Sequence, residues 1–261
     1  MVGRSDKKGS RVAITGDLDA NTLSIGANTQ LLGEIRGRGN VVEIADTLNP
    51  QSVYVSIFGN GNHIQIGRRS LLQNMRIDIG SKRWPCSRSR LTIGESFSIG
   101  SGGRFILPNS GNVVEIGKDC MFSNSIQLRA GEYPHLIFDD ESGSYLDVSE
   151  GIFIGDHAWI GEGAYITKAV TIGRESIVGA RSVVTKRFDE EHVVIAGNPA
   201  RIVKRGVRWI ANEQHFAGRD DLEASFQAAE VHRINAEERG LNKADQAPVA
   251  PPQDGAFGKS D

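Results

Sequence analysis

The sequence has very little cysteine and no long apolar run. Its 261 residues include two cysteines, Cys86 and Cys120, which lie far apart and have no neighbours at metal-ligand spacing. They predict neither a disulfide framework nor a zinc site, and we expect no metal cofactor. No stretch is apolar for long enough to cross a bilayer, and the polar start "MVGRSDKKGS" precedes no apolar segment. We therefore expect a cytoplasmic protein without a membrane span.

An excess of charge of one sign is also lacking. The 30 Lys and Arg residues and the 32 Asp and Glu residues leave a formal net charge of −2. No global field draws such a chain to nucleic acid, so we expect no nucleic-acid partner. Any anionic ligand must be recognised by a local group of residues.

What the sequence does contain is an aliphatic residue at every sixth position. The run is formed by Ile154, Ile160, Ile166, Ile172, Val178 and Val184. Glycine directly follows four of these residues. A period of six is typical of a β-helix, in which each hexapeptide forms a short strand and a corner, and three hexapeptides close one triangular coil. The aliphatic residue points into the prism, and the glycine relieves crowding at the turn.

Upstream, the same signal recurs in a looser register. The spacing of six is kept from Ile93 to Phe105 and from Ile116 to Leu128, and insertions break the phase between these blocks. A β-sandwich or barrel is the alternative, but its strands would alternate with a period of two. We therefore predict an all-β triangular solenoid over residues 1–205, with a loop insertion at about 129–151.

The six-residue signal ends near Gly206. Beyond it, "DDLEASFQAAEVHRINAEERG" places Leu222, Phe226 and Ala229 at helical spacing, after an Asp pair suited to capping. We predict a helical extension over residues 206–240. The last stretch, residues 241–261, is rich in Pro, Gly, Ala and Asp, and we predict that it is a disordered tail.

Residues 151–205 resemble the hexapeptide-repeat acyltransferases. The resemblance lies in "IGDHAWIG", "IVGARSVVTK" and the closing "AGNPARIVK". It implies a left-handed parallel β-helix, a homotrimer, and transfer of an acyl group, usually acetyl from acetyl-CoA, to a hydroxyl or amine that is often on a sugar. A trimer also follows from physics, since one flat face of a triangular prism is poorly covered unless a neighbour packs on it. The active sites would then lie between subunits.

The predicted insertion loop is the expected place for chemistry, because loops on rigid scaffolds commonly carry function. Acyl transfer needs a base that takes the proton of the attacking hydroxyl, and histidine suits this task near neutral pH. His135, in "YPHLIFD", looks like the loop histidine of sugar and xenobiotic acetyltransferases of this family, which makes it the candidate base. Loop membership alone makes Glu132, Tyr133 and Asp139 candidates for binding sugar hydroxyls.

Two further residues are catalytic candidates by resemblance. Asn124 lies one position from where a family asparagine is expected, and it has the alternative of a corner residue, since asparagine is favoured in left-handed backbone. His157 matches a recurrent family position. Because it lies inside a regular coil, we favour for it a hydrogen bond that steadies the active-site loop over direct catalysis.

The donor site is likewise carried over from the family. The resemblance places Trp159 and Gly161 along the pantetheine arm of acetyl-CoA, with Ala180 bonding the arm through its backbone. It places Thr185 and Lys186 at the nucleotide end. Arg201 and Lys186 are cations available for the phosphates.

The leading hypothesis is an acetyl-CoA-dependent O-acetyltransferase that acts on a sugar or polysaccharide precursor, with direct attack and His135 as general base. Xenobiotic acetylation is a second enzymatic hypothesis, and the irregular N-terminal coils favour a carbohydrate pathway over it. A non-catalytic β-helix scaffold is the alternative from another class. A carbonic-anhydrase-like zinc site would need tightly spaced histidines, which the sequence lacks.

Overall fold

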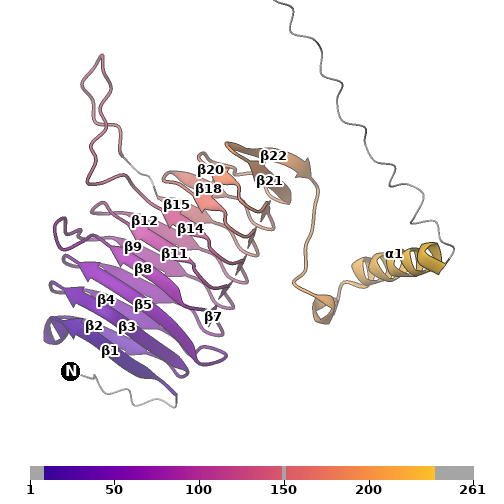
Figure 1. Cartoon of the computed structure of the whole chain (residues 1–261), viewed down its shortest axis with the longest axis horizontal. Coiled ribbons are helices and arrows are strands. Elements are labelled where there is room, and N and C mark those ends of the chain that lie inside the picture. Colours follow the sequence, from indigo (N-terminus) through magenta and orange to yellow (C-terminus); the bar gives the residue numbers. More distant parts are fainter. Residues whose placement is uncertain (1–8, 149–150, 239–261) are drawn as a thin grey trace, which may run out of the picture. The chain divides into compact units, whose positions relative to one another are not determined.

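The protein is a left-handed parallel β-helix followed by a helical segment, as the sequence predicted (Figure 1). The structure, a computed structural model, describes residues 9–148 and 151–238. The chain divides into two compact units between Trp209 and Ile210. The predicted disordered tail, residues 241–261, lies outside the described residues.

The strands of the β-helix form three sheets, which are the faces of the prism. Face 1 consists of β1 (Arg11–Gly16), β3 (Thr29–Arg36), β5 (Gln51–Phe58), β8 (Met75–Ile79), β11 (Arg104–Leu107), β14 (Gln127–Arg129), β17 (Tyr165–Ile166) and β20 (Val183–Val184). Face 2 consists of β2 (Thr22–Ile25), β4 (Val41–Ile44), β6 (His63–Ile66), β9 (Arg90–Ile93), β12 (Val113–Ile116), β15 (Ile152–Ile154) and β18 (Val170–Ile172). Face 3 consists of β7 (Leu71–Leu72), β10 (Ser98–Ile99), β13 (Met121–Phe122), β16 (Trp159–Ile160), β19 (Ile177–Val178), β21 (Val193–Gly197) and β22 (Ala200–Arg205).

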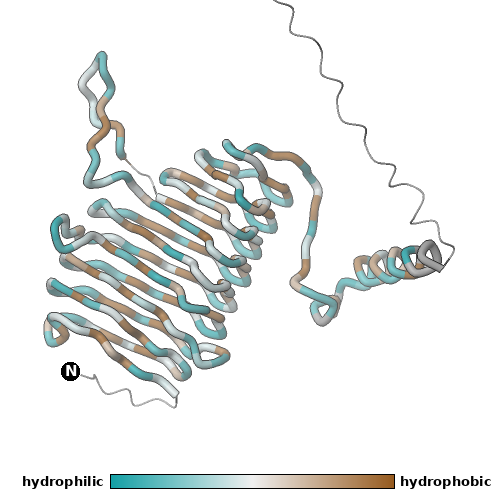
Figure 2. Tube along the Cα trace, viewed as in Figure 1, coloured by the Kyte–Doolittle hydropathy of each residue, from teal (hydrophilic) through white to brown (hydrophobic). Residues whose placement is uncertain are grey.

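The six-residue repeat places one aliphatic residue inside each face. Ile154, Ile160 and Ile166 lie on faces 2, 3 and 1 in turn, and all three are buried. The next three members of the repeat lie in register beside them, one coil further along. The aliphatic side chains of the repeat therefore stack on their counterparts in the adjacent coil and belong to one continuous core. Figure 2 shows hydrophobic residues recurring along the coils of the prism.

The N-terminal coils are longer, and hydrogen bonds between stacked asparagine side chains hold one of their corners. Strands β3 and β5 have eight residues each, which explains the loose register of the repeat in this part of the sequence. Asn40 donates from Nδ2 to Asn21 Oδ1 at 2.9 Å, and Asn62 donates from Nδ2 to Asn40 Oδ1 at 2.9 Å. This asparagine ladder pairs polar groups that burial would otherwise leave unsatisfied.

The β-helix ends in a hairpin. Strands β21 and β22 pair antiparallel, unlike every other strand pair of the described residues. The chain then runs back along the corner between faces 2 and 3, where the Val207 amide donates to His192 O at 2.9 Å. A short 3-10 helix, η1 (Leu18–Ala20), lies near the other end of this unit.

The second unit contains η2 (Glu213–His215) and α1 (Asp220–Glu238). The helix begins at Asp220, so the Asp pair lies in its first turn and not before it, where carboxylates still offset the exposed amides. The ring centroids of Phe216 and Phe226 lie 5.6 Å apart. Within the described residues of the chain, no helix is both long and apolar enough to cross a bilayer.

Candidate active site

The insertion loop, residues 131–148, leaves the prism at the corner between faces 1 and 2. Leu128 ends the regular pattern on face 1 and Ile152 resumes it on face 2, and both side chains are fully buried. The repeat is therefore uninterrupted in space although it is interrupted in sequence. Figure 1 shows the loop extending away from the prism.

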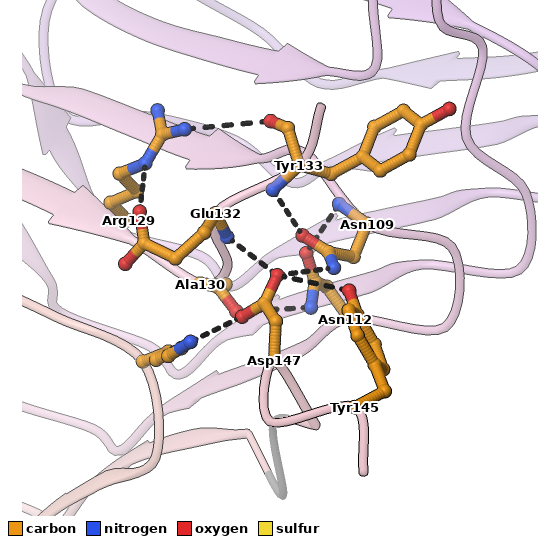
Figure 3. Close-up of polar contacts among 9 residues, drawn as sticks. Asn109, Asn112, Arg129, Ala130, Glu132, Tyr133, Tyr145 and Asp147 are labelled. Carbon is orange, nitrogen blue, oxygen red and sulfur yellow. Dashed lines mark hydrogen bonds and ion pairs between the residues drawn. The ribbon is translucent and has the colours of Figure 1, made fainter. Parts of the chain in front are cut away.

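Asp147 anchors the returning end of this loop (Figure 3). Its carboxylate is buried and accepts hydrogen bonds from Asn109 Nδ2 and from the Glu132 amide, each at 2.9 Å. It also forms an ion pair with Lys168, which lies in the next coil. Asn109 in turn accepts a bond from the Tyr133 amide at 3.2 Å. The two ends of the loop are thus tied to one buried carboxylate.

The environment of Asp147 favours its charged form. Burial by itself raises the pKa of the carboxyl, but the bonds from Lys168, Asn109 and the Glu132 amide together outweigh this effect. The pKa of Asp147 is therefore held below its ordinary value, and the anchor carries a negative charge at neutral pH.

The three predicted sugar-binding residues occupy different parts of the loop. Glu132 Oε2 lies 3.6 Å from Arg129 Nε, and the Tyr133 carbonyl accepts from Arg129 at 3.5 Å. Asp139 closes a turn near the tip, because its Oδ1 accepts from the amide and the hydroxyl of Ser142. Those bonds lower the pKa of Asp139. Glu132 and Tyr133 are brought together at the base of the loop, and Asp139 lies apart from them.

His135 is exposed and lies between these two regions. Its amide donates to Glu132 O at 3.1 Å. Among the described residues, no hydrogen bond or ring contact joins its imidazole to another candidate residue. The corner that carries the loop lies opposite face 3, where Trp159 is found. One chain by itself therefore does not bring the candidate base to the candidate donor site.

His157 lies at the corner between faces 2 and 3. Its φ of 53° is in the left-handed region, and Nδ1 lies 2.8 Å from Glu175 Oε2 in the next coil. The ring stacks on Trp209, with centroids 4.2 Å apart and planes 13° apart, and the His157 carbonyl accepts from Trp209 Nε1 at 2.8 Å. These contacts fix the end of the first unit on the prism, and they do not reach the insertion loop of the same chain.

Asn124 occupies the corner between faces 3 and 1. Its Oδ1 accepts from the Ser101 amide at 3.0 Å, which ties two successive coils together. The left-handed residue of this corner is the neighbouring Ser125, with φ of 58°. The side chain of Asn124 therefore bonds at a corner, but the residue with left-handed backbone at this corner is Ser125.

The donor candidates on face 3 form a coherent surface. Trp159 points outward between Met121 and Ile177, its register neighbours on β13 and β19. Gly161 lies directly over the Ala180 amide, so close that an added Cβ would be 2.6 Å from that nitrogen. Gly161 thus allows its own coil to pack closely on the Ala180 amide of the next coil, and Trp159 lies two residues before Gly161.

The cationic candidates lie further along the helix axis and on separate faces. Thr185 and Lys186 follow β20 of face 1 and are exposed, and Lys186 Nζ lies 5.4 Å from the centroid of the Phe188 ring. Arg201 belongs to β22 on face 3, where it is opposite Ala196. Within one chain these residues do not form a single cationic pocket.

Sequence reasoning missed two groups of residues. The first is the loop anchor of Asp147 and Lys168, since nothing in the sequence separates a buried loop carboxylate from its exposed neighbours. The second is a pair of arginines on face 1, Arg76 and Arg104, which are direct register neighbours although 28 positions apart in sequence. Only the register of β8 and β11 shows that these two arginines are neighbours. Among residues 9–148 and 151–238, no three potential metal ligands cluster.

Comparisons with known proteins agree with this architecture. The model of the bacterial transferase hexapeptide family (six repeats) matches residues 151–186. A polysialic acid O-acetyltransferase of Escherichia coli O1:K1 / APEC is 36% identical over 143 residues, which cover 55% of this chain and 45% of that protein. This chain thus spans less than half the length of that relative. A predicted acetyltransferase of Dictyostelium discoideum is 36% identical over 162 residues, which cover 61% of this chain and 74% of that protein.

The likeness extends to a solved structure. The crystal structure of the polySia-specific acetyltransferase NeuO has a TM-score of 0.57 and 26% sequence identity, and the match covers 85% of this chain and 99% of that chain. The repeat, the three-faced prism and these matches lead to one conclusion. The chain belongs to the hexapeptide-repeat acetyltransferase family.

Proposed function

We propose that the protein transfers an acetyl group from acetyl-CoA to a hydroxyl of an acidic polysaccharide. The observation that carries the proposal is the match to NeuO over almost its whole length, because that enzyme is described as specific for polysialic acid. The Escherichia coli relative is likewise described as a polysialic acid O-acetyltransferase. A cytoplasmic enzyme would have access to acetyl-CoA.

His135 is the general base in this proposal. The imidazole takes the proton of the acceptor hydroxyl as its oxygen attacks the thioester carbonyl carbon. The tetrahedral oxyanion then collapses, the carbon–sulfur bond breaks, and the CoA thiolate takes the proton from the imidazolium. The products are the acetyl ester and CoA with a free thiol. The exposed position of His135 suits a base that must reach a large acceptor.

Face 3 is the donor side. In this proposal the amide of Ala180, which packs against Gly161, donates a hydrogen bond to the pantetheine arm, and Trp159 supplies a flat apolar wall. Thr185, Lys186 and Arg201 are proposed at the nucleotide end. We retain His157 as a support of this side, because Trp209 stacks on it and lies 5.9 Å from the Trp159 ring centroid. Asn124 stays a catalytic candidate by resemblance, with a corner residue as its alternative, and its side chain bonds the Ser101 amide at the corner after face 3.

The site is completed by a neighbouring subunit. The loop corner lies opposite face 3 of the same prism, so His135 of one subunit would meet Trp159 of the next subunit in a closed ring of copies. The family resemblance implies a homotrimer, and this geometry supports a shared site. On the acceptor side we propose Glu132, Tyr133 and Asp139, with the first two nearest to the prism.

The test is acceptor-dependent thiol release from acetyl-CoA. Wild type, His135→Ala and the control His63→Ala, which alters a histidine on face 2, would be assayed with polysialic acid, neutral sugars, nucleotide sugars and antibiotic alcohols. We expect release with the acidic polysaccharide, a loss of about 10²- to 10⁴-fold in His135→Ala, and near-normal activity in the control. Antibiotic-dependent release would favour xenobiotic acetylation, and neither binding nor turnover of acetyl-CoA would favour a scaffold.

A further inference from the structure

Face 1 carries a surface depression that the proposed chemistry does not use. A hollow of about 350 Å³ lies over β5, β8, β11 and β14, and it is bordered by Tyr133 and Pro134 at the base of the insertion loop. A second hollow, of about 410 Å³, lies beside it over β3 and β5. Phe58 lines both, so the two hollows adjoin, and we treat them together as one trough along the helix axis.

Two arginines in the trough are held in place by one buried carboxylate. Arg76 Nε donates to Asp78 Oδ1 at 2.9 Å, and Arg104 Nε donates to Asp78 Oδ2 at 2.7 Å. The side chain of Asp78 is 9% exposed, whereas those of Arg76 and Arg104 are 42% and 50% exposed. The buried carboxylate of Asp78 therefore orients both guanidinium groups, whose outer parts are exposed to solvent. The single negative charge of Asp78 does not neutralise the two positive charges.

The terminal nitrogens of Arg104 are available to a ligand. In the part of the chain that the structure describes, the bond from Arg104 to a protein acceptor runs through Nε. The two Nη groups form a fork whose geometry matches a carboxylate. Arg76 Cζ lies 4.4 Å from the centroid of the Tyr54 ring, and this cation–π contact helps to hold the guanidinium in place.

The whole trough is cationic although the chain is not. Its lining contains the cations Arg36, Arg76, Lys82, Arg104 and Arg129 and the carboxylates Glu34 and Asp78. Cations remain in excess even when Glu132, the partner of Arg129, is counted. Since the formal net charge of the chain is −2, this excess is a local feature. Trp84, Tyr133 and Phe58 add rings that can pack on sugar faces.

We propose that this trough is an extended acceptor subsite, which binds several acidic sugars of a polyanionic polysaccharide and leads the chain to His135. From β3 to β14 the trough crosses four strand spacings, about 19 Å, which exceeds the size of one sugar. It ends at Tyr133 and Pro134, next to the candidate base. The inference rests on the proposed function, and it adds the surface and the residues that bind the carboxylates of the polymer.

Binding can be measured separately from catalysis. The His135→Ala protein would be titrated with polysialic acid, with neutral dextran and with single-stranded DNA. We expect polysialic acid to bind in a salt-sensitive manner and more tightly than DNA or dextran. Arg104→Gln should weaken the binding of polysialic acid about tenfold, because one guanidinium–carboxylate contact is lost. The matched control, Arg90→Gln, alters an exposed strand arginine on face 2 and should bind as the parent does.

A second variant tests for a gain of binding. Gln127 is the exposed register neighbour of Arg104 on β14, so Gln127→Arg lengthens the cationic row by one coil. We expect it to bind polysialic acid about threefold more tightly. Unchanged affinity in both variants, or tighter binding of DNA, would overturn the proposal.

Kinetics in the active protein separate this subsite from the proposed reaction. In Arg104→Gln, the KM for the polymer should rise while the KM for acetyl-CoA keeps its wild-type value. A raised KM for acetyl-CoA alone would assign the arginine to the donor and refute the acceptor subsite. If wild type releases no thiol with any acceptor, the proposed function fails, whereas the binding measurements still decide whether the trough holds a polyanion.

Discussion

Asp147 and Lys168 form an ion pair that joins the end of the insertion loop to the next coil of the prism. The same carboxylate binds Asn109 and the Glu132 amide, which lie before and at the start of the loop. One buried charge therefore closes the loop at its base. His135 lies within the closed segment, so its position depends on this pair.

The first prediction concerns that anchor. Asp147→Ala leaves the Lys168 ammonium without its partner and removes the acceptor of the Glu132 amide, so we expect a loss of about 3 kcal/mol in the free energy of unfolding. Chemical denaturation measures this loss, and hydrogen exchange of residues 131–148 reports release of the loop. Asp140→Asn, which alters an exposed loop carboxylate, is the control and should change neither quantity. Unaltered exchange in Asp147→Ala would show that the loop is held by other contacts.

The second prediction is the pH dependence of the same anchor. Because the folded state holds the pKa of Asp147 below its unfolded value of about 3.9, its contribution to stability is fully present above that value. The contribution is lost as the pH falls through the lower, folded pKa. The difference in unfolding free energy between wild type and Asp147→Asn should thus be constant from about pH 7 to pH 5 and shrink below about pH 4. A difference that grows on acidification would contradict the assignment.

The third prediction tests the close approach on face 3. A Cβ at Gly161 would lie 2.6 Å from the Ala180 amide nitrogen, whereas a Cβ at Gly179 would first meet the Ala196 Cβ at 3.0 Å. Gly161→Ala must therefore displace backbone and should destabilise the protein by about 1–3 kcal/mol and weaken acetyl-CoA binding. Gly179→Ala is the matched control, and calorimetry with acetyl-CoA compares the two. Equal affinity in both variants would remove the Ala180 amide from the donor site.

The fourth prediction addresses the shared site. His135→Ala and Trp159→Ala should each be inactive alone, but copies mixed in equal amounts and reassembled should regain roughly a quarter of the wild-type sites if each site takes one residue from each of two subunits. Mixing His135→Ala with the double variant His135→Ala/Trp159→Ala should restore nothing. Absence of activity in the first mixture would show that the two residues do not act across an interface.

The fifth prediction concerns the cysteines. Burial raises the pKa of the Cys86 thiol to about 11 and that of Cys120 to about 12. Since the thiolate is the reactive form, both should be inert to a disulfide reagent at pH 8 in the folded protein and react once it is unfolded. The absorbance of the thiol that the reagent releases gives the number of cysteines that have reacted. Rapid labelling of the native protein would indicate an opening of the core.

The regular part of the fold was predictable because its signal is local. Ile154 and Ile160 occupy successive faces of one coil, so a period read directly from the sequence specifies where each side chain points. The eight-residue strands β3 and β5 hide the period, and their corners are instead marked by asparagines at unequal spacing. The type of fold was therefore clear, whereas the boundaries of the early coils were not.

The candidate site was less predictable because its members meet through register. The sequence singles out His135 by its motif, but it does not show that Asp147 is buried or that Arg76 lies beside Arg104. Both facts depend on how many residues each preceding coil contains. A pattern of six cannot supply that count where insertions interrupt it.

The insertion loop has a consequence for how such proteins can diversify. Leu128 and Ile152 continue the core on either side of it, so the prism does not depend on what the intervening segment contains. Only the ties at its base must be kept. The loop can therefore be exchanged without altering the β-helix. Replacing the segment between Leu128 and Ile152 by that of a relative, with Asp147 and Lys168 retained, should change the preference for the acceptor while the prism keeps its fold.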